Sequence, residues 1–290
     1  MNQNNLEDFF TFVLEREALR INKLQHPDHP QQWTTNEILR VHRFCNVNRE
    51  HDAVTIWIEK NLREFFHDKS LGLVVPSLFL ARIYNEPETL KHILPELRFG
   101  YYDRSLELIK ELRANGQKAM RGAYMVAPHG PKGKGRTPEE YFTEATIGLY
   151  GSIVNYGSNA ITSFEELAEI MARVNGVGPF FINQVVADLR YMPQSENFPD
   201  WGDFILAGPG TRRGLNRLAD RKLHQGVRNQ VCKDELLEVR ELALDALPKV
   251  VWDHFRDINN LSNCFCEYDK YCRGREQYEQ GKRLTLRRYK

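Results

Sequence analysis

The sequence predicts a mainly α-helical protein. Apolar residues recur every three to four positions over most of the chain, which is the period of a helix with one buried face. Only residues 122–126 favour an extended segment, and the sequence contains no internal repeat and no low-complexity linker. We therefore expect one mainly helical domain over residues 1–290, with an N-terminal helical lobe over 1–125, a loop at 127–137 and a second lobe over 138–290.

The N-terminal half contains several stretches with helical spacing. Val54, Ile58 and Leu62 recur at the spacing of a core-facing helix side. Thr34, with Glu37 three residues later, has the pattern that begins a helix. The helices expected in this half cover residues 6–21, a stretch beginning at Thr34, and residues 49–66, 71–84 (interrupted by Pro76) and 103–114, the last ending at Gly116.

The C-terminal half continues the helical pattern. Thr137 followed by Pro138 is a favoured helix start, because proline suits the first helical position. The helices expected in this half cover residues 138–156, both arms of a hairpin within 163–188, a short stretch after Thr211, and residues 233–247, 250–258 and 262–271.

The segment 163–188 predicts two helices joined by a Gly-Val-Gly turn, a helix-hairpin-helix motif. Ser163 suits the N-cap of the first helix, with Glu166 as its capping-box partner. Gly176 and Gly178 permit backbone angles that larger residues avoid. Such a turn directs free N–H groups of a helix N-terminus outward, where the helix dipole favours a DNA phosphate. The alternative is an ordinary helical hairpin whose glycines only allow close packing.

Composition sets the broad class of the protein. A chain of 290 residues can bury a core, and 41% hydrophobic with 27% charged residues is ordinary for a globular protein. No apolar run is long enough to span a bilayer, and the N-terminus lacks the pattern of a secretory signal. The five cysteines lack C-x-x-C pairs, and no nearby histidine completes a metal set. We expect a cytosolic protein with no membrane partner, disulfide, metal or cofactor.

The charge is locally concentrated. A net charge of +1 argues against a protein that coats DNA by bulk electrostatics, so contacts with nucleic acid must use local patches. Two basic runs supply such patches, one between Gly208 and Arg228 and one over residues 273–290. A solvated charged face is the ordinary explanation for either run alone. Together with a phosphate-binding turn, they favour nucleic acid.

Residues 130–137 nearly match the phosphate-binding loop G-x-x-x-x-G-K-[ST]. Arg136 stands where the lysine belongs, Pro138 follows closely, and no apolar strand ending in Asp follows to hold magnesium. These departures favour a basic loop over an NTP-hydrolysing one. Lys132, Lys134 and Arg136 are then expected to contact DNA or a phosphorylated group.

Candidate substrate-binding residues lie at 46–52. Helical spacing would put Arg49 and Asp52 on one face, where they can hold a substrate carboxylate or phosphate beside a base. Asn46 completes this set. The alternative for Arg49 and Asp52 is a surface ion pair.

Further candidates lie in the C-terminal half. The stretch 208–214, GPGTRRG, brings Thr211, Arg212 and Arg213 to a helix start, which suits an anion. Asp188, on the second arm of the hairpin, is a candidate catalytic carboxylate, with capping or ion pairing as its alternative.

One turn near the C-terminus combines acids, a phenol and an amine. Glu267, Tyr268, Asp269 and Lys270 follow one another in a predicted helix with aromatic neighbours. Both a catalytic role for Glu267 and Asp269 with substrate binding by Lys270, and a solvated helix face, fit this pattern.

The chain resembles a known family from about residue 40 to residue 289. Five sequence blocks carry this resemblance, in the order FCNVNREHD, RGAYMVAP, NGVGPFFINQVVADL, GPGTRRGLNRL and CEYDKYCRGRE. The chain resembles the helical family of phage thymine-hypermodification proteins. That family includes the helical domain associated with 5-hydroxymethyl-deoxyuridine DNA kinases and the α-glutamyl/putrescinyl-thymine pyrophosphorylases, also called amino acid:DNA transferases. The resemblance implies a fold related to helix-hairpin-helix DNA glycosylases and a phosphorylated or pyrophosphorylated 5-hydroxymethyluracil in DNA as the substrate.

The resemblance implies a transferase rather than a kinase, because the chain shows no credible phosphate-binding loop domain. The amine or hydroxyl of an amino acid or polyamine would replace the phosphate of the base, which must first leave the stack of the duplex DNA. The expected setting is the cytoplasm of a phage-infected bacterium, with a separate 5-hydroxymethyluracil DNA kinase as a partner. The chemistry asks for cations at the leaving group (Arg212, Arg213), a base (Asp52, Asp188 or Asp269) and a group to hold the carboxylate (Arg49 or Lys270).

Two other functions fit the same sequence. A base-excision glycosylase would use Asp200 or Asp203, at the distance past the turn that the resemblance implies for its catalytic acid. Phe180 and Phe181 stand where such enzymes often carry a lysine, so only a monofunctional glycosylase would fit. The other alternative is a non-catalytic subunit that presents DNA to a kinase.

Overall fold

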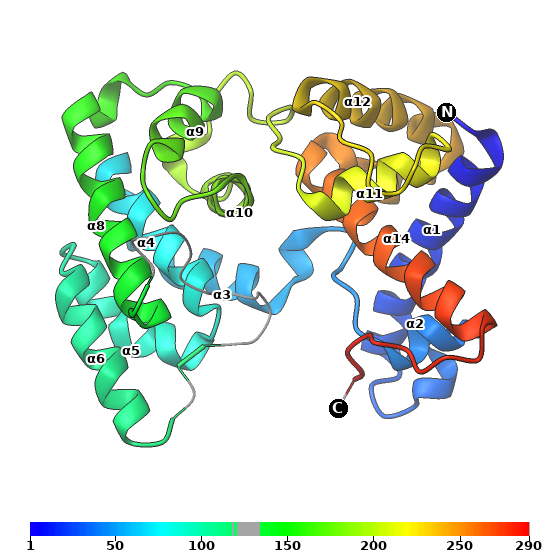
Figure 1. Cartoon of the computed structure of the whole chain (residues 1–290), viewed down its shortest axis with the longest axis horizontal. Coiled ribbons are helices and arrows are strands. Elements are labelled where there is room, and N and C mark those ends of the chain that lie inside the picture. The colour runs from blue at the N-terminus through cyan, green and yellow to red at the C-terminus, as the bar shows by residue number, and fades with distance from the viewer. Residues whose placement is uncertain (118, 121–133, 290) are drawn as a thin grey trace. The chain divides into compact units, whose positions relative to one another are not determined.

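The computed structural model describes residues 1–117, 119–120 and 134–289, and over these residues it consists of helices and turns with no strand (Figure 1). One isolated antiparallel bridge joins His42 to Arg288. The prediction of a mainly α-helical protein is confirmed. The segment 122–126, expected to be extended, lies outside the described residues. None of the described helices combines the length and apolar character that crossing a membrane requires.

The chain forms two compact units. Unit 1 joins the two ends of the sequence, residues 1–52 and 205–290, and unit 2 is the continuous segment 53–204. These boundaries differ from the predicted lobes, because the predicted dividing loop at 127–137 falls inside unit 2. Contacts between segments far apart in sequence assemble unit 1, and local spacing carries no information on such contacts.

Unit 2 is built around one buried helix, α4. Every residue of α4 except Leu73 is buried, and the helix packs against α8 and α10. Pro76 does not interrupt it. The helices of unit 2 are α3 (Ala53–Leu62), α4 (Leu71–Tyr84), α5 (Pro87–Leu97), α6 (Tyr102–Ala114), α8 (Pro138–Tyr156), α9 (Phe164–Ala172) and α10 (Pro179–Leu189), with the short 3₁₀ turns η3 (Ser158–Ala160) and η4 (Pro193–Ser195).

Unit 1 is built around α14, which packs closely against α11. A Cβ atom at Gly210 would overlap the Cys266 side chain, and one at Gly214 would overlap the Phe265 carbonyl oxygen. The glycines of the GPGTRRG stretch therefore allow two helices to approach closely. The elements of unit 1 are α1 (Gln3–Gln25), η1 (Pro30–Gln32), α2 (Glu37–Val41), η2 (Arg49–His51), α11 (Pro209–Leu218), α12 (Asn229–Ala246), α13 (Lys249–Trp252), η5 (Asp253–Arg256) and α14 (Ile258–Glu279).

Several predicted helix boundaries need correction. The single helix expected over 49–66 is the 3₁₀ turn η2 followed by α3, because the Asn48 side chain accepts the Glu50 N–H at 2.9 Å and Asp52 is extended. Asn36 rather than Thr34 caps α2.

Other differences concern whole elements. Helix α5 was not expected, the stretch 250–258 consists of α13 and η5, and α14 begins before and ends after the predicted 262–271. Asp257 caps α14 by accepting the Asn259 N–H at 2.9 Å.

Candidate functional site

The turn between α9 and α10 has one packed side and one open side. The Ser163 hydroxyl accepts the Glu166 N–H at 3.2 Å, while the Glu166 carboxylate accepts the N–H of Thr162 at 2.8 Å rather than that of Ser163. Gly176 has a left-handed φ of 91° and is buried beside α8. Gly178 has a φ of −88°, which any residue adopts, so the expectation of an unusual backbone holds only for Gly176.

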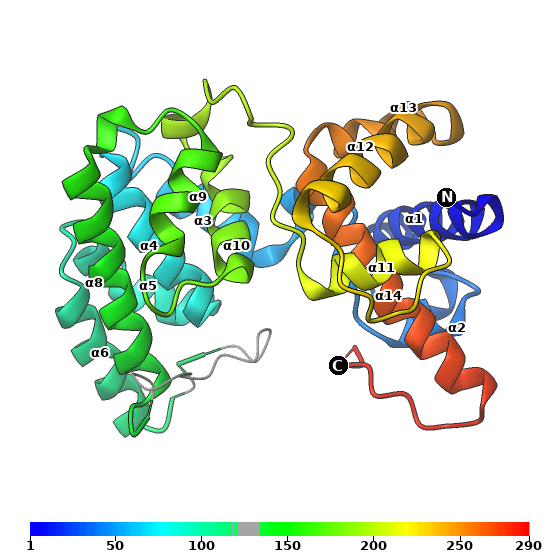
Figure 2. The same cartoon turned by 45° about the horizontal axis from the view of Figure 1, so that its top comes forward.

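The open side begins at Gly178. No atom lies within 4 Å of the position that a Cβ of Gly178 would take, and Pro179 and Phe180 are exposed. Figure 2 shows this turn between the labelled helices α9 and α10. The first turn of α10 is therefore accessible from solvent.

Two aspartates considered for catalysis have structural partners in unit 2. Asp188 is fully buried in an ion pair with Arg82, which also donates to the Thr55 hydroxyl at 3.0 Å. Asp200 accepts the N–H groups of Phe164 and Glu165, both at 3.0 Å, and so caps α9. Both carboxylates therefore stabilise the fold locally.

The basic loop before α8 is described only at its end. Lys132 and most of the near-match to a phosphate-binding loop lie outside the described residues. Lys134 is exposed, and Arg136 forms an ion pair with Glu144. Thr137 caps α8 in a complete capping box with Glu140. The threonine of the near-match to a phosphate-binding loop is therefore the N-cap of a helix.

The acids and arginines of α11 and α14 form an internal network in unit 1. Asp269 has no exposed surface and accepts hydrogen bonds from Arg213 at 2.8 Å, Arg217 at 3.1 Å and Arg273 at 3.2 Å. Arg213 keeps 25% of its side chain exposed.

Two neighbours on α11 bind protein groups as well. Arg212 donates to the carbonyl oxygens of Ala207 and Val227, and the Thr211 hydroxyl is within 2.9 Å of the Ser262 hydroxyl. The cations expected to hold an anion thus hold α11 in place, although Arg212 and Arg213 are both part-exposed.

A second polar group lies where the loop after α2 meets α14. Glu267 accepts the Cys45 N–H at 3.0 Å and forms an ion pair with Lys270 at 2.9 Å. Asp52 accepts both the backbone N–H and the side-chain amide of Asn46, at 3.2 and 3.0 Å. The negative charge of Glu267 raises the pKa of the Cys45 thiol, which favours its neutral form.

Arg49 lies near this second polar group. It is 6% exposed, and its backbone N–H donates to the Asn260 side chain at 3.1 Å. Its guanidinium group forms no hydrogen bond or ion pair with the residues that the structure describes. Arg49, Asp52, Glu267 and Lys270 all act electrostatically on the Cys45 thiol. The guanidinium nitrogens of Arg49 keep contact with solvent, so an anionic ligand can reach them and form charged hydrogen bonds.

The two polar groups lie on α14, one around Asp269 and one around Glu267, with Cys266 beside both. Burial and Glu267 raise the pKa of the Cys266 thiol to about 11, and Lys270, Asp269 and Arg213 also act on it. We use the name α14 site for the set Asn46, Arg49, Asp52, Arg213, Glu267, Asp269 and Lys270. These seven predicted residues lie in unit 1, divided between the two polar groups. Asp188, Gly176, Gly178, Lys134 and Arg136 belong to unit 2.

Asn260 is a residue of this site that the sequence analysis missed. Its side-chain oxygen accepts the Arg49 N–H, and its side-chain amide donates to the His254 carbonyl oxygen at 2.9 Å. The only sequence signal was a pair of asparagines at the start of the helix. Its contact with Arg49 spans 211 positions and has no local signature.

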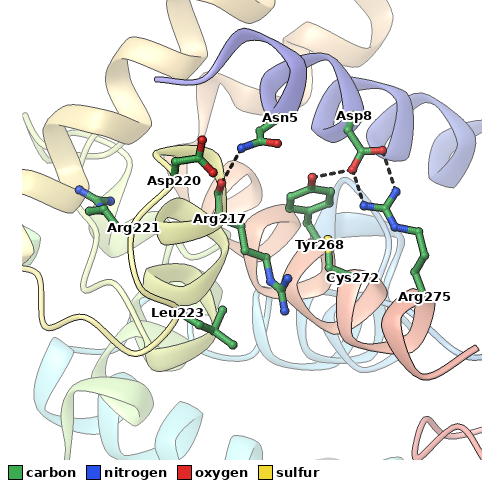
Figure 3. Close-up of a pocket in the computed structure, with 9 residues that line it drawn as sticks. All are labelled: Asn5, Asp8, Arg217, Asp220, Arg221, Leu223, Tyr268, Cys272 and Arg275. Carbon is green, nitrogen blue, oxygen red and sulfur yellow. Dashed lines mark hydrogen bonds and ion pairs between the residues drawn. The ribbon is translucent and has the colours of Figure 1, made fainter. Parts of the chain in front are cut away.

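A polar cavity of about 330 Å³ opens elsewhere in unit 1 (Figure 3). Asp8 accepts two hydrogen bonds from Arg275, both at 2.9 Å, and one from the Tyr268 hydroxyl at 2.7 Å. Arg217 and Arg221, from the first basic run, also line it and are paired with Glu276 and Glu235. None of the predicted site residues lines this cavity. Much of the predicted basic charge is therefore neutralised within unit 1.

Comparison with known proteins gives the family. The model of the family described as 5-hmdU DNA kinase, helical domain, matches residues 3–281. A 5-hmdU DNA kinase of Bacillus phage SP10 is 26% identical over 226 residues, which are 71% of this chain and 35% of that kinase. The chain thus spans about a third of the kinase's length. No solved structure matches the chain. Because the family model covers almost the whole sequence, this protein belongs to the 5-hmdU DNA kinase helical-domain family.

Proposed function

We propose that this protein acts in the hypermodification of thymine in DNA, as a transferase. It replaces the phosphate or pyrophosphate of a phosphorylated 5-hydroxymethyluracil with an amino acid or polyamine, in the cytoplasm of a phage-infected bacterium. The observation that carries the proposal is the guanidinium of Arg49, a residue only 6% exposed, which has no partner among the described residues and shares its surroundings with two carboxylates. The family and its phage relative supply the DNA base.

The reaction is a substitution at the exocyclic methylene carbon. The nitrogen or hydroxyl oxygen of the incoming molecule forms a bond to this carbon, and the C–O bond to the phosphate breaks. The bonding electron pair leaves with the phosphate or pyrophosphate. The incoming group loses one proton, so the site needs a base on one side and a cation on the other.

The α14 site offers a group for each task. Arg49 holds the carboxylate of an amino acid, because a guanidinium binds a carboxylate through two hydrogen bonds. Asp52 or Glu267 takes the proton. They suit this role better than Asp188 or Asp269, whose carboxylates are fully buried in ion pairs. Arg213, which keeps solvent access, stabilises the departing phosphate better than Arg212, which braces backbone carbonyls.

The α9–α10 turn serves as the contact with the DNA backbone. The open surroundings of Gly178 and the exposed start of α10 support a phosphate contact of the helix-hairpin-helix kind. The target base leaves the duplex before it reacts, because its methylene carbon is otherwise enclosed by the stack. In this proposal the fold is related to that of DNA glycosylases.

A second candidate function is a DNA-binding subunit of a separate 5-hydroxymethyluracil DNA kinase. It is favoured by the family itself, whose description is the helical domain of a 5-hmdU DNA kinase. The glycosylase alternative rests on Asp203, which is exposed, because both oxygens of Asp200 accept backbone N–H groups of α9.

One experiment separates the three functions. Duplex DNA containing phosphorylated or pyrophosphorylated 5-hydroxymethyluracil is incubated with the protein and pooled amino acids and polyamines, and its nucleosides are then weighed by mass spectrometry. A new adduct supports the transferase. An abasic site supports the glycosylase, and binding without either product supports the kinase subunit.

A further inference from the structure

The C-terminal segment of unit 1 returns from the end of α14 to the loop after α2 (Figure 1). Arg43 donates its backbone N–H to the Arg287 carbonyl oxygen at 2.8 Å, and Tyr289 donates to the Val41 carbonyl oxygen at 3.0 Å. His42 adds a contact to the Leu286 carbonyl oxygen at 3.2 Å. These contacts fix the backbone of the segment.

The returning segment gathers cations from three parts of the chain. The Lys23 ammonium lies 4.1 Å from the ring centre of Tyr289 and 4.8 Å from that of Trp33. The Arg43 guanidinium lies 5.9 Å from the centre of the same tyrosine ring. Arg287 and Arg288 follow on the segment itself. We use the name C-terminal patch for Lys23, Arg43, Arg287, Arg288 and Tyr289.

The positive charges of this patch are not neutralised by acids. Among the described residues, the side chains of Arg43, Arg287 and Arg288 form no ion pair, and all three residues are exposed. Burial and the positive charges of Arg43 and Arg16 lower the pKa of Lys23. The arginines lining the cavity of Figure 3 differ, since Arg217, Arg221 and Arg275 each have an acidic partner.

We propose that the C-terminal patch binds the phosphate backbone of DNA. Cations held close together by a fixed backbone lose little freedom when they meet phosphates, and each contact releases counter-ions from the DNA. A lipid surface fits less well, because Trp33 is 6% exposed and its ring is not available for insertion. The assignment deepens the proposed function by naming a surface that holds the substrate, and it rests on that function only in taking DNA as the ligand.

The test measures the binding of unmodified duplex DNA by fluorescence anisotropy between about 50 and 200 mM salt. The double variant Arg287→Gln/Arg288→Gln is expected to weaken binding at the lower salt concentration about tenfold or more, and to reduce the slope of log affinity against log salt by about 2. Arg43→Gln is expected to reduce the slope by about 1. Circular dichroism checks that the variants fold.

The matched control is Lys249→Gln/Arg256→Gln, which removes the same charge from exposed residues that are both paired with Asp253. The proposal is overturned if the control weakens binding as much as the patch variant, if the patch variant binds DNA like the wild type, or if the patch variant loses binding to anionic lipid vesicles but not to DNA. Because no modified base and no co-substrate are used, failure of the transferase assay leaves this result unaffected. If the patch variants bind DNA like the wild type, the transferase activity can still be tested by the nucleoside mass assay.

Discussion

Buried charged side chains in this protein are of two kinds. Asp188 and Asp269 have arginine partners at hydrogen-bonding distance, whereas the Arg49 guanidinium has none among the described residues. In the sequence all three occur as charged residues within a helical pattern, and spacing alone cannot tell a structural ion pair from an unsatisfied cation. The difference depends on partners far away in the chain.

Replacement of Arg49 should separate stability from function. Arg49→Gln removes a buried charge without a counter-ion, so the melting temperature should stay the same or rise. The same change should lower transfer from an amino acid at least about 100-fold, because a bidentate charged hydrogen bond is lost together with positioning of the substrate. Thermal unfolding and the nucleoside mass assay measure the two effects.

Asp188→Asn is the control for this variant. It leaves Arg82 buried and unpaired, so it should lower the free energy of unfolding by about 3–5 kcal/mol, as measured in urea. A variant of Arg49 that unfolds as readily as Asp188→Asn would show that Arg49 has a structural role instead.

Acid should destabilise the protein through Glu17. Burial opposes its charge, but the nearby His254 ring and the hydrogen bonds from Arg20 outweigh burial and lower the pKa of Glu17 from 4.5 to about 2. The stabilisation is therefore complete above pH 4.5 and is lost as the pH falls towards 2, with a loss of up to about 3 kcal/mol. The free energy of unfolding should fall more steeply over this window in the wild type than in Glu17→Gln. Parallel curves would contradict this assignment.

At the scale of elements, helices with strong local signals were predicted well. Helix α8 runs over the predicted 138–156, because its start is defined by the neighbouring residues Thr137, Pro138 and Glu140. The predicted helix over 49–66 was wrong at its start. The Asn48 side-chain oxygen accepts the Glu50 N–H, and this hydrogen bond favours a 3₁₀ turn. That turn changes the site, since Arg49 and Asp52 are not on one face of a helix. The ion pair of Glu267 with Lys270 is local, whereas their contacts with Cys45 and Arg43 are tertiary and could not be predicted from spacing.

The close packing of α11 on α14 predicts opposite effects at two glycines. Gly214→Ala should destabilise the protein by about 1–3 kcal/mol or more, because its Cβ would overlap the Phe265 backbone. Gly151→Ala, inside α8 with open space around it, should stabilise by about 0.5–1 kcal/mol through helix propensity. Urea unfolding measures both, and equal effects would argue against tight α11–α14 packing.

The α9–α10 turn can be tested without disturbing its fold. Gly178→Asp places a good N-cap residue at a position with ordinary backbone angles and open space, so α10 should be as stable or more stable. Its negative charge should repel a phosphate and weaken DNA binding about tenfold. Ser163→Asp makes a similar change at the N-cap of α9 and should bind DNA like the wild type. Equal DNA binding by the two variants would show that the α9–α10 turn does not contact DNA.

At the scale of the whole molecule, the features proposed to act on DNA are distributed over both units. Unit 1 carries the α14 site and the C-terminal patch, and unit 2 carries the α9–α10 turn. The helical class could be predicted from periodicity, because helix formation is largely local. The division into units could not, because unit 1 is closed by contacts between the two ends of the sequence.

The central claim is that the α14 site transfers an amino acid or polyamine to a phosphorylated base in DNA. The most direct measurement is mass spectrometry of nucleosides from DNA carrying phosphorylated or pyrophosphorylated 5-hydroxymethyluracil, after incubation with wild-type protein or Arg49→Gln and each co-substrate in turn. We expect an adduct in which the phosphate is replaced, formed by the wild type and strongly reduced in the variant with amino acids. Recovery of only the unchanged phosphorylated nucleoside from DNA that the wild-type protein binds would contradict the claim.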